Sequence, residues 1–142
     1  HQEKYKNLPP KKILTTNEIK LEKERLSDYI IPRIYELSTG KNLPKIISIK
    51  ITSSEKRWGS CSSKNGLCFS YRLAEYLPQE LSSWDTKDLL WKNLTFIDAI
   101  IIHELAHLIE KNHQKPFWDL VYSWMPNYEK EIKKSNHWEN IY

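Results

Sequence analysis

Residues 95–109 of this chain read TFIDAIIIHELAHLI. Apolar side chains occupy almost every face of the helix that this stretch predicts, so we expect it to lie buried in the middle of a domain. Thr95, with Asp98 three residues later, has the pattern of a helix N-terminus, so we expect this helix to begin at Thr95. Three polar side chains interrupt the apolar surface, and these are His103, Glu104 and His107.

The two histidines have the spacing of a metal site. His103 and His107 are four residues apart, so their imidazoles project from one face of the helix, one turn apart. Two ring nitrogens can then reach one Zn²⁺ ion at roughly 2.0–2.1 Å. Glu104 points away, and its carboxylate can act as general base on a water held by the metal. A metal also removes the cost of burying these polar groups without partners.

His113 is the predicted third ligand. It follows Lys111 and Asn112, whose polar character indicates that the helix has ended, and Asn tolerates the left-handed backbone of a chain reversal. The spacing of the three imidazoles matches that of metzincin peptidases, except that Glu110 stands where those enzymes have glycine. Glu110 is a rival ligand and His137 a remote one, and the alternative for His113 is a capping or surface histidine.

The region before the metal helix predicts a small sheet. Ile47, Ile49 and Ile51 alternate with polar residues, which is typical of a half-buried strand. Asn65-Gly66 is a strong signal for a two-residue hairpin turn between residues 56–62 and 67–72. We therefore expect an α+β domain in which about three short antiparallel strands pack on the central helix.

The two cysteines are predicted to be reduced. A two-residue turn pairs Ser63 with Cys68 and Cys61 with Ser70, so the cysteines become diagonal neighbours roughly 7–8 Å apart. This separation is too large for an unstrained disulfide. Reduced thiols favour a cytoplasmic protein.

Helices are predicted on both sides of this core. Thr15 to Glu18 forms a capping box, and Gly40 is the stop signal of the helix that follows. Pro32 lies inside it and predicts a kink or break near residues 28–32. Residues 78–93 predict a connecting loop with one helical turn around residues 85–90.

After the metal helix, Pro116 suits the first turn of another helix, with an inward stripe of Phe117, Leu120, Val121 and Trp124. Pro126 ends it, and a polar helix is predicted over residues 127–138.

Composition restricts the partners. The 142 residues are 39% hydrophobic and 28% charged, an ordinary globular composition. The longest apolar run, Ala99–Ile102, is far short of the ~20 residues that span a bilayer, so no membrane partner is expected. A net charge of +4 without a basic and aromatic stripe disfavours nucleic acid. Residues 1–14 are predicted to be a basic arm or the remnant of an upstream region, and residues 15–142 a single domain.

Four motifs together resemble the YgjP-like metallopeptidase family, whose relatives are the SprT-like and WLM zinc peptidases. The resemblance covers residues 30–128 and implies a zincin-like α+β domain. It also implies one zinc ion on His103, His107 and His113, with Glu104 as catalytic base. The motifs are Arg57-Trp58-Gly59-Ser60-Cys61, His103-Glu104-Leu105-Ala106-His107, Asn112-His113 with Pro116-Phe117-Trp118, and Met125-Pro126-Asn127-Tyr128.

Five residues are candidates for substrate binding. An extended peptide can add to an edge strand beside the cleft, where Gly59 allows close approach and Trp58 offers a flat wall. The alternatives are a core role for Trp58, a carboxylate partner for Arg57 and a bulge at Gly59. Tyr71 and Arg72 are candidate contacts to the oxyanion or to a substrate end, with a structural role as the alternative.

The favoured function is a zinc-dependent metallopeptidase that hydrolyses peptide bonds through a metal-bound water activated by Glu104. The alternative enzyme is a nucleotide or phosphate-anhydride hydrolase of the pyrophosphatase type, with Arg57, Lys64 and Arg72 binding phosphate oxygens. A third hypothesis is a non-catalytic, zinc-stabilised binding module. Structural zinc sites usually have four protein ligands, however, and only three are apparent here.

Overall fold

The computed structural model describes residues 13–77 and 87–133, and for residues 87–94 it describes only the helix that they form. The described residues form helices and a three-stranded sheet, which confirms the predicted α+β class. In chain order the elements are α1 (Thr16–Ser38), β1 (Ser48–Thr52), β2 (Gly59–Cys61), β3 (Gly66–Ser70), the 3₁₀ helix η2 (Tyr71–Tyr76), α2 (Lys87–His107), α3 (Lys115–Trp124) and α4 (Tyr128–Ile132).

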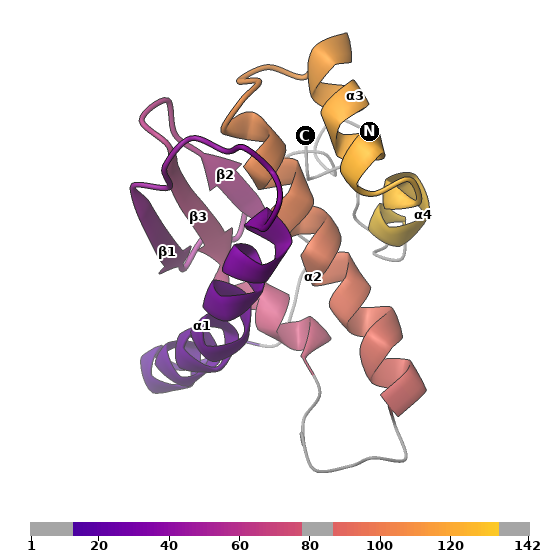
Figure 1. Ribbon diagram of the computed structural model, residues 1–142. Helices are drawn as coiled ribbons and strands as arrows, with labels where there is room; N and C mark the ends of the chain where they lie inside the picture. The colour runs from indigo at the N-terminus through magenta and orange to yellow at the C-terminus, as the bar shows by residue number, and fades with distance from the viewer. Residues whose placement is uncertain (1–12, 78–86, 134–142) are drawn as a thin grey trace, which may run out of the picture.

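Helix α2 lies in the middle of the molecule. Figure 1 shows the sheet and α1 on one side of it, and α3 and α4 on the other. Every side chain from Phe96 to Leu108 is buried, which confirms the prediction from the apolar sequence. Among the helices that the structure describes, none combines the length and the apolar character that crossing a membrane requires.

The predicted start of α2 is wrong, because the helix already begins at Lys87 and not at Thr95. Asn93 and Thr95 are weak helix formers, but neither Gly nor Pro occurs between residues 87 and 95 to end the helix. Intrinsic propensity is a weak guide in such a case. The rest of the predicted connecting loop, residues 78–86, lies outside the described residues.

The sheet has the order β1-β3-β2 and is mixed. β2 and β3 are antiparallel as predicted, whereas β1 pairs with β3 in parallel, so the expectation of three antiparallel strands is wrong for β1. The reason lies in the connection of residues 53–58. This connection places β2 two strand positions away from β1, which leaves a gap about 5 Å wide between them. The chain then turns back, and β3 fills the gap, antiparallel to β2 and therefore parallel to β1.

The hairpin turn has three residues and not two. Ser62 N–H donates to the Gly66 carbonyl at 2.9 Å, and Asn65 N–H donates to the Ser62 carbonyl at 3.0 Å. Asn65 has a φ of 67°, the left-handed conformation that closes a three-residue loop over residues 63–65. Asn65 was thus correctly predicted as a turn residue, but the turn begins two residues earlier than predicted and ends one residue earlier.

This turn changes the predicted register. Cys61 pairs with Leu67 and not with Ser70, and Cys68 pairs with Ser60. Because opposite residues share a face, the two cysteines lie on opposite faces of the sheet. Both are free thiols, as predicted. Cys61 shares the face of Leu67, which looks toward α2.

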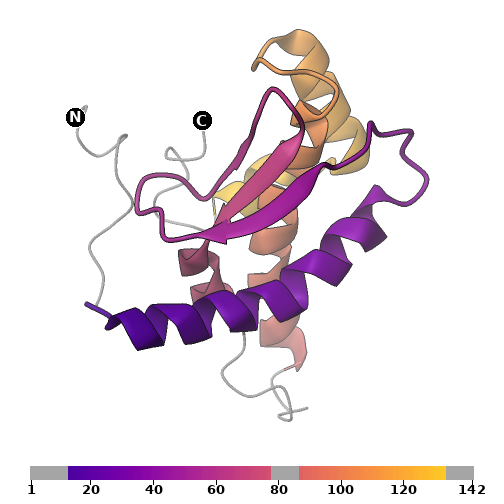
Figure 2. The ribbon, with the colours of Figure 1, turned by 90° about the vertical axis from the view of Figure 1, so that its left-hand side faces the viewer.

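Helix α1 begins with the predicted capping box. Thr15 Oγ1 accepts from Glu18 N–H at 3.1 Å, and Glu18 Oε1 accepts from Thr15 N–H at 2.9 Å. Of the kink or break predicted near residues 28–32, the break does not occur, because the buried side chains of Ile30 and Ile34 hold the helix against the core on both sides of Pro32. Figure 2 shows α1 running along the sheet.

A partly buried ion pair joins α1 to α2. Arg33 donates through Nε to Asp98 Oδ1 at 2.9 Å and through Nη2 to Oδ2 at 2.8 Å. The Tyr29 hydroxyl donates to the same carboxylate at 3.3 Å. Burial, and then the Asp98 charge, raises the pKa of Tyr29 far above its usual value. Because Asp98 precedes His103 by little more than one turn, the pair also holds the half of α2 that carries the two histidines.

Helix α3 follows the prediction, whereas α4, predicted over residues 127–138, ends at Ile132 with Lys133 as its C-cap. Pro116 lies in the first turn of α3, and the stripe that begins with Phe117 packs into the core. The helix ends before Pro126, and α4 begins at Tyr128. The end of the predicted terminal helix, residues 134–138, lies outside the described residues, as do residues 1–12 of the predicted basic arm.

Candidate metal centre

Three imidazoles converge at the carboxyl end of α2. His103 Nε2 lies 3.2 Å from His113 Nε2, and His107 Nε2 lies 3.1 Å from the same atom. The ligand atoms of the three rings all lie within 4.8 Å of one another. The structure therefore brings together the three predicted ligands. The rival His137 lies outside the described residues, and Glu110 is not a member of this group.

The chain returns to the metal helix through a tight turn. Past His107, the N–H groups of residues 108–110 still donate to the carbonyls of residues 105 and 106, at 2.9–3.1 Å. Asn112 does not adopt the predicted left-handed backbone, since Asn65 is the one non-glycine residue with positive φ among those described. Its Oδ1 instead accepts from Gln114 N–H at 3.3 Å, and this short-range turn directs His113 inward.

The spacing of the nitrogens fits a metal ion. Two atoms that each bind Zn²⁺ at roughly 2.0–2.1 Å in tetrahedral geometry lie about 3.3 Å apart, close to the 3.1 and 3.2 Å found here. His107 Nδ1 lies 2.9 Å from the Glu110 carbonyl, which can only accept, so this ring carries its proton on Nδ1 and leaves Nε2 free to bind. Burial lowers the pKa of all three imidazoles, which favours their neutral, metal-binding form.

Glu104 lies beside the triad and is 2% exposed. Its Oε1 atom has no hydrogen-bond partner within the described parts of the chain. Burial raises the pKa of its carboxyl to about 8, although the Arg57 guanidinium acts in the opposite direction. The side chain packs on Gly59, where an added Cβ would lie 3.2 Å from both Cγ and Oε2 of Glu104. A buried carboxyl that takes up a proton near neutral pH suits a general acid or base.

The triad and Glu104 open into one pocket. β2 and the residue two positions before it supply one side of the pocket, α2 supplies the imidazoles and the carboxylate, and the turn after α2 supplies another side. The lining residues are Arg57, Gly59, Ser60, Cys61, His103, Glu104, His107, Lys111 and His113.

Two of the five candidate substrate-binding residues, Arg57 and Gly59, line this pocket. Trp58 does not, because its ring is 1% exposed and packs edge-on against Tyr76 and Phe96 at 5.7 and 5.5 Å between centroids. Trp58 therefore anchors the segment between two pocket residues to the core.

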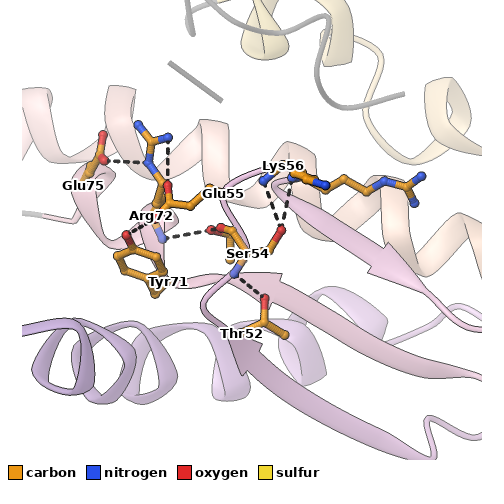
Figure 3. Close-up of polar contacts among 9 residues, drawn as sticks. Thr52, Ser54, Glu55, Lys56, Tyr71, Arg72 and Glu75 are labelled. Atoms are coloured by element: carbon orange, nitrogen blue, oxygen red, sulfur yellow. Dashed lines mark hydrogen bonds and ion pairs between the residues drawn. The ribbon is translucent and has the colours of Figure 1, made fainter. Parts of the chain in front are cut away.

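Tyr71 and Arg72 lie outside the pocket, in a polar network that Figure 3 shows. The Arg72 guanidinium is buried and contacts Glu55 at 3.4 Å and Glu75 at 3.3 Å. The Tyr71 hydroxyl donates to the same Glu55 carboxylate. These contacts fix the segment after β1 against η2. That segment ends at Arg57, whose N–H donates to Ser54 Oγ at 3.4 Å.

Sequence reasoning missed the residues that orient the imidazoles. The Tyr128 hydroxyl of α4 lies 2.9 Å from His103 Nδ1. The Trp118 indole of α3 donates to the His113 carbonyl at 3.0 Å and stacks on the His113 ring at 5.9 Å. Both belong to motifs recognised in the sequence, but nothing in their spacing indicated these contacts. Lys111 in the pocket was missed as well.

An α+β fold with three imidazoles converging on a helix defines a protein with a candidate metal centre. The model of one protein family, the YgjP-like metallopeptidase domain, matches residues 2–82 and 87–136. The chain therefore belongs to the YgjP-like family, as its motifs predicted. No match was found among curated proteins or among solved structures.

Proposed function

We propose that this protein is a zinc-dependent metallopeptidase that hydrolyses peptide bonds in a protein or peptide substrate, with Glu104 as general base. The observation that carries the proposal is the convergence of three Nε2 atoms beside a buried carboxylate in an open pocket. Family membership supports the peptidase class. The two free cysteines support a cytoplasmic location.

His103, His107 and His113 would hold the ion. When bound there, zinc supplies Lewis acidity toward a substrate carbonyl and toward water. Glu104 takes a proton from the attacking water at its carboxylate and later gives it to the departing amine. Its buried position favours the protonated form after the first step, because burial disfavours the charged carboxylate.

Substrate binding is assigned to the edge strand and to Arg57. β2 is the last strand of the sheet on the pocket side, so an extended peptide can add to it through main-chain hydrogen bonds. Gly59 leaves room for this approach, and Arg57 can donate to a substrate oxygen. We assign Trp58, Tyr71 and Arg72 a positioning role, because their contacts hold the segment that carries Arg57.

The test compares zinc content and proteolysis of an unfolded protein in three variants. We expect Glu104→Gln to retain about one equivalent of zinc and to lose activity by about 10²–10⁴-fold, the usual contribution of a general base. His113→Ala should lose most of the zinc. Lys115→Gln, on the exposed face of α3, should leave both unchanged. Full proteolysis by Glu104→Gln would refute the proposed mechanism.

A second candidate is the phosphate-anhydride hydrolase, which the cations Arg57 and Lys111 in the pocket favour. Of the three predicted phosphate ligands, Arg57 alone lines the pocket, since neither Lys64 nor Arg72 does. Pyrophosphate release from nucleoside triphosphates, lost in Glu104→Gln and without any proteolysis, would replace the peptidase proposal with this one.

A further inference from the structure

The charges around the pocket are unbalanced. Besides the three imidazoles, its lining holds two cations, Arg57 and Lys111, and one acid, the buried Glu104. Arg57 forms no ion pair with a carboxylate within the described parts of the chain, although seven ion pairs occur elsewhere in those parts. Its side chain is exposed, so its charge is free to meet a ligand.

Lys111 is held in place by uncharged groups. Its ammonium donates to the Ser62 carbonyl at 3.2 Å and to the Asn65 side-chain oxygen, and it lies 3.9 Å from the Cys61 sulfur. These contacts join the turn after α2 to the hairpin. They fix the ammonium beyond the end of β2 without neutralising it, because neither acceptor carries a charge.

The two cations lie at opposite ends of β2. Arg57 precedes Gly59, the first residue of the strand, and Lys111 contacts Cys61, the last. Both cations line the same pocket as the three imidazoles. The imidazole triad thus has a cation on each side, and Glu104 is the one acid among the residues that line the pocket.

We propose that the preferred substrates are acidic peptides, with one carboxylate side chain on each side of the scissile bond, bound by Arg57 and by Lys111. This inference rests on the proposed peptidase function. Arg57 lies two positions before β2, with a bend at residue 58, so the backbone from residue 57 to residue 61 spans at most roughly 13 Å at about 3.3 Å per residue. An added strand has the same rise, so the two acidic residues should be about four positions apart.

The opposite charge should be rejected. A guanidinium binds a carboxylate through two parallel hydrogen bonds, whereas a lysine at the same substrate position meets a like charge. Both cations are exposed to solvent, so salt should weaken the preference.

The experiment uses three fluorogenic peptides of equal length, with Glu, Gln or Lys at the two flanking positions. We expect the Glu peptide to be cleaved with a kcat/KM at least tenfold above that of the Gln peptide, mainly through KM, and the Lys peptide to be the poorest. Raising the salt from 50 to 500 mM should reduce the preference to a few-fold. Arg57→Gln and Lys111→Gln should each remove most of it.

Two further variants sharpen the test. Lys111→Glu should favour a peptide with Lys on one flank and Glu on the other over the peptide with Glu on both. Lys115→Gln is the matched control, because this lysine is 84% exposed, pairs with Asp119 and lies outside the pocket. Its substrate preference should equal that of the natural protein.

The outcomes separate this inference from the proposed function. Equal cleavage of the Glu and Gln peptides would overturn the inference and leave the peptidase intact. If none of the peptides is cleaved, the peptidase proposal fails, and binding of the Glu and Gln peptides to Glu104→Gln protein, measured by fluorescence anisotropy, decides the inference. At least tenfold tighter binding of the Glu peptide supports it, and equal or absent binding overturns it.

Discussion

Replacing Tyr128 with Phe removes one hydroxyl group that lies 2.9 Å from His103 Nδ1. The Tyr128 side chain is 0% exposed, so solvent cannot take the place of the lost oxygen without repacking. Loss of a group that orients a ligand typically lowers metal affinity by about 10–100-fold, or about 1.4–2.8 kcal/mol. The ring itself remains and keeps its stacked contact with His103 at 6.2 Å, so we expect folding stability to fall by only about 1 kcal/mol.

The assay is a zinc titration in competition with a chromophoric chelator, together with a thermal unfolding curve. Tyr122→Phe is the matched control, because this tyrosine is 39% exposed and its ring contacts Tyr128 and Trp118. An affinity of Tyr128→Phe within twofold of the natural protein would refute the argument that this hydroxyl orients His103.

Three other predictions follow from the contacts described. Asp98→Ala leaves the Arg33 guanidinium without its bidentate partner and should lower the free energy of unfolding, measured in urea, by about 2–3 kcal/mol. This loss is below the usual range for fully buried pairs because Arg33 is 27% exposed. Tyr29 keeps its proton to a higher pH in the folded state than in the unfolded state, where its pKa is about 10. Its contribution to stability is therefore complete below about pH 10 and is lost as the pH rises above that value. Gly59→Ala should displace the Glu104 carboxylate and lower kcat by at least about tenfold, with zinc affinity unchanged, since the added Cβ would lie 3.2 Å from Glu104 Cγ.

Each of these predictions has its own control. Breaking the exposed pair of Lys133 and Glu129 by Lys133→Gln should cost at most about 1 kcal/mol. Urea unfolding between pH 9 and 11 should show a shallower loss for Tyr29→Phe than for the natural protein, and parallel curves would contradict the assignment. For Gly59→Ala, an unchanged kcat would show that Glu104 tolerates the added methyl group.

The metal helix could be predicted because its information is local. The apolar character of almost every face of residues 96–109 and the four-residue spacing of His103 and His107 are both readable within a few turns, and His113 required only a chain turn after them. The start of the same helix was missed, because the only signal was a weak cap at Thr95. Likewise the Asn65-Gly66 signal located the hairpin, yet its register depends on whether two or three residues form the turn.

Contacts between distant segments could not be predicted. The parallel pairing of β1 depends on how the chain crosses the sheet, which no periodicity encodes. Tyr128 lies 25 residues from His103, and Lys111 lies 46 residues from Asn65, so their hydrogen bonds depend on the packing of whole elements. The candidate residues Tyr71 and Arg72 were selected for their chemistry, but the path of the chain places them away from the pocket.

The two imidazoles of α2 are oriented by segments made at different times during synthesis. The Glu110 carbonyl holds His107 from only three residues away, whereas His103 depends on Tyr128 in α4, 25 residues further along. A growing chain on the ribosome therefore contains all three ligands before it can orient the first of them. We therefore expect the proposed zinc site to reach its full affinity only after α4 has emerged and docked.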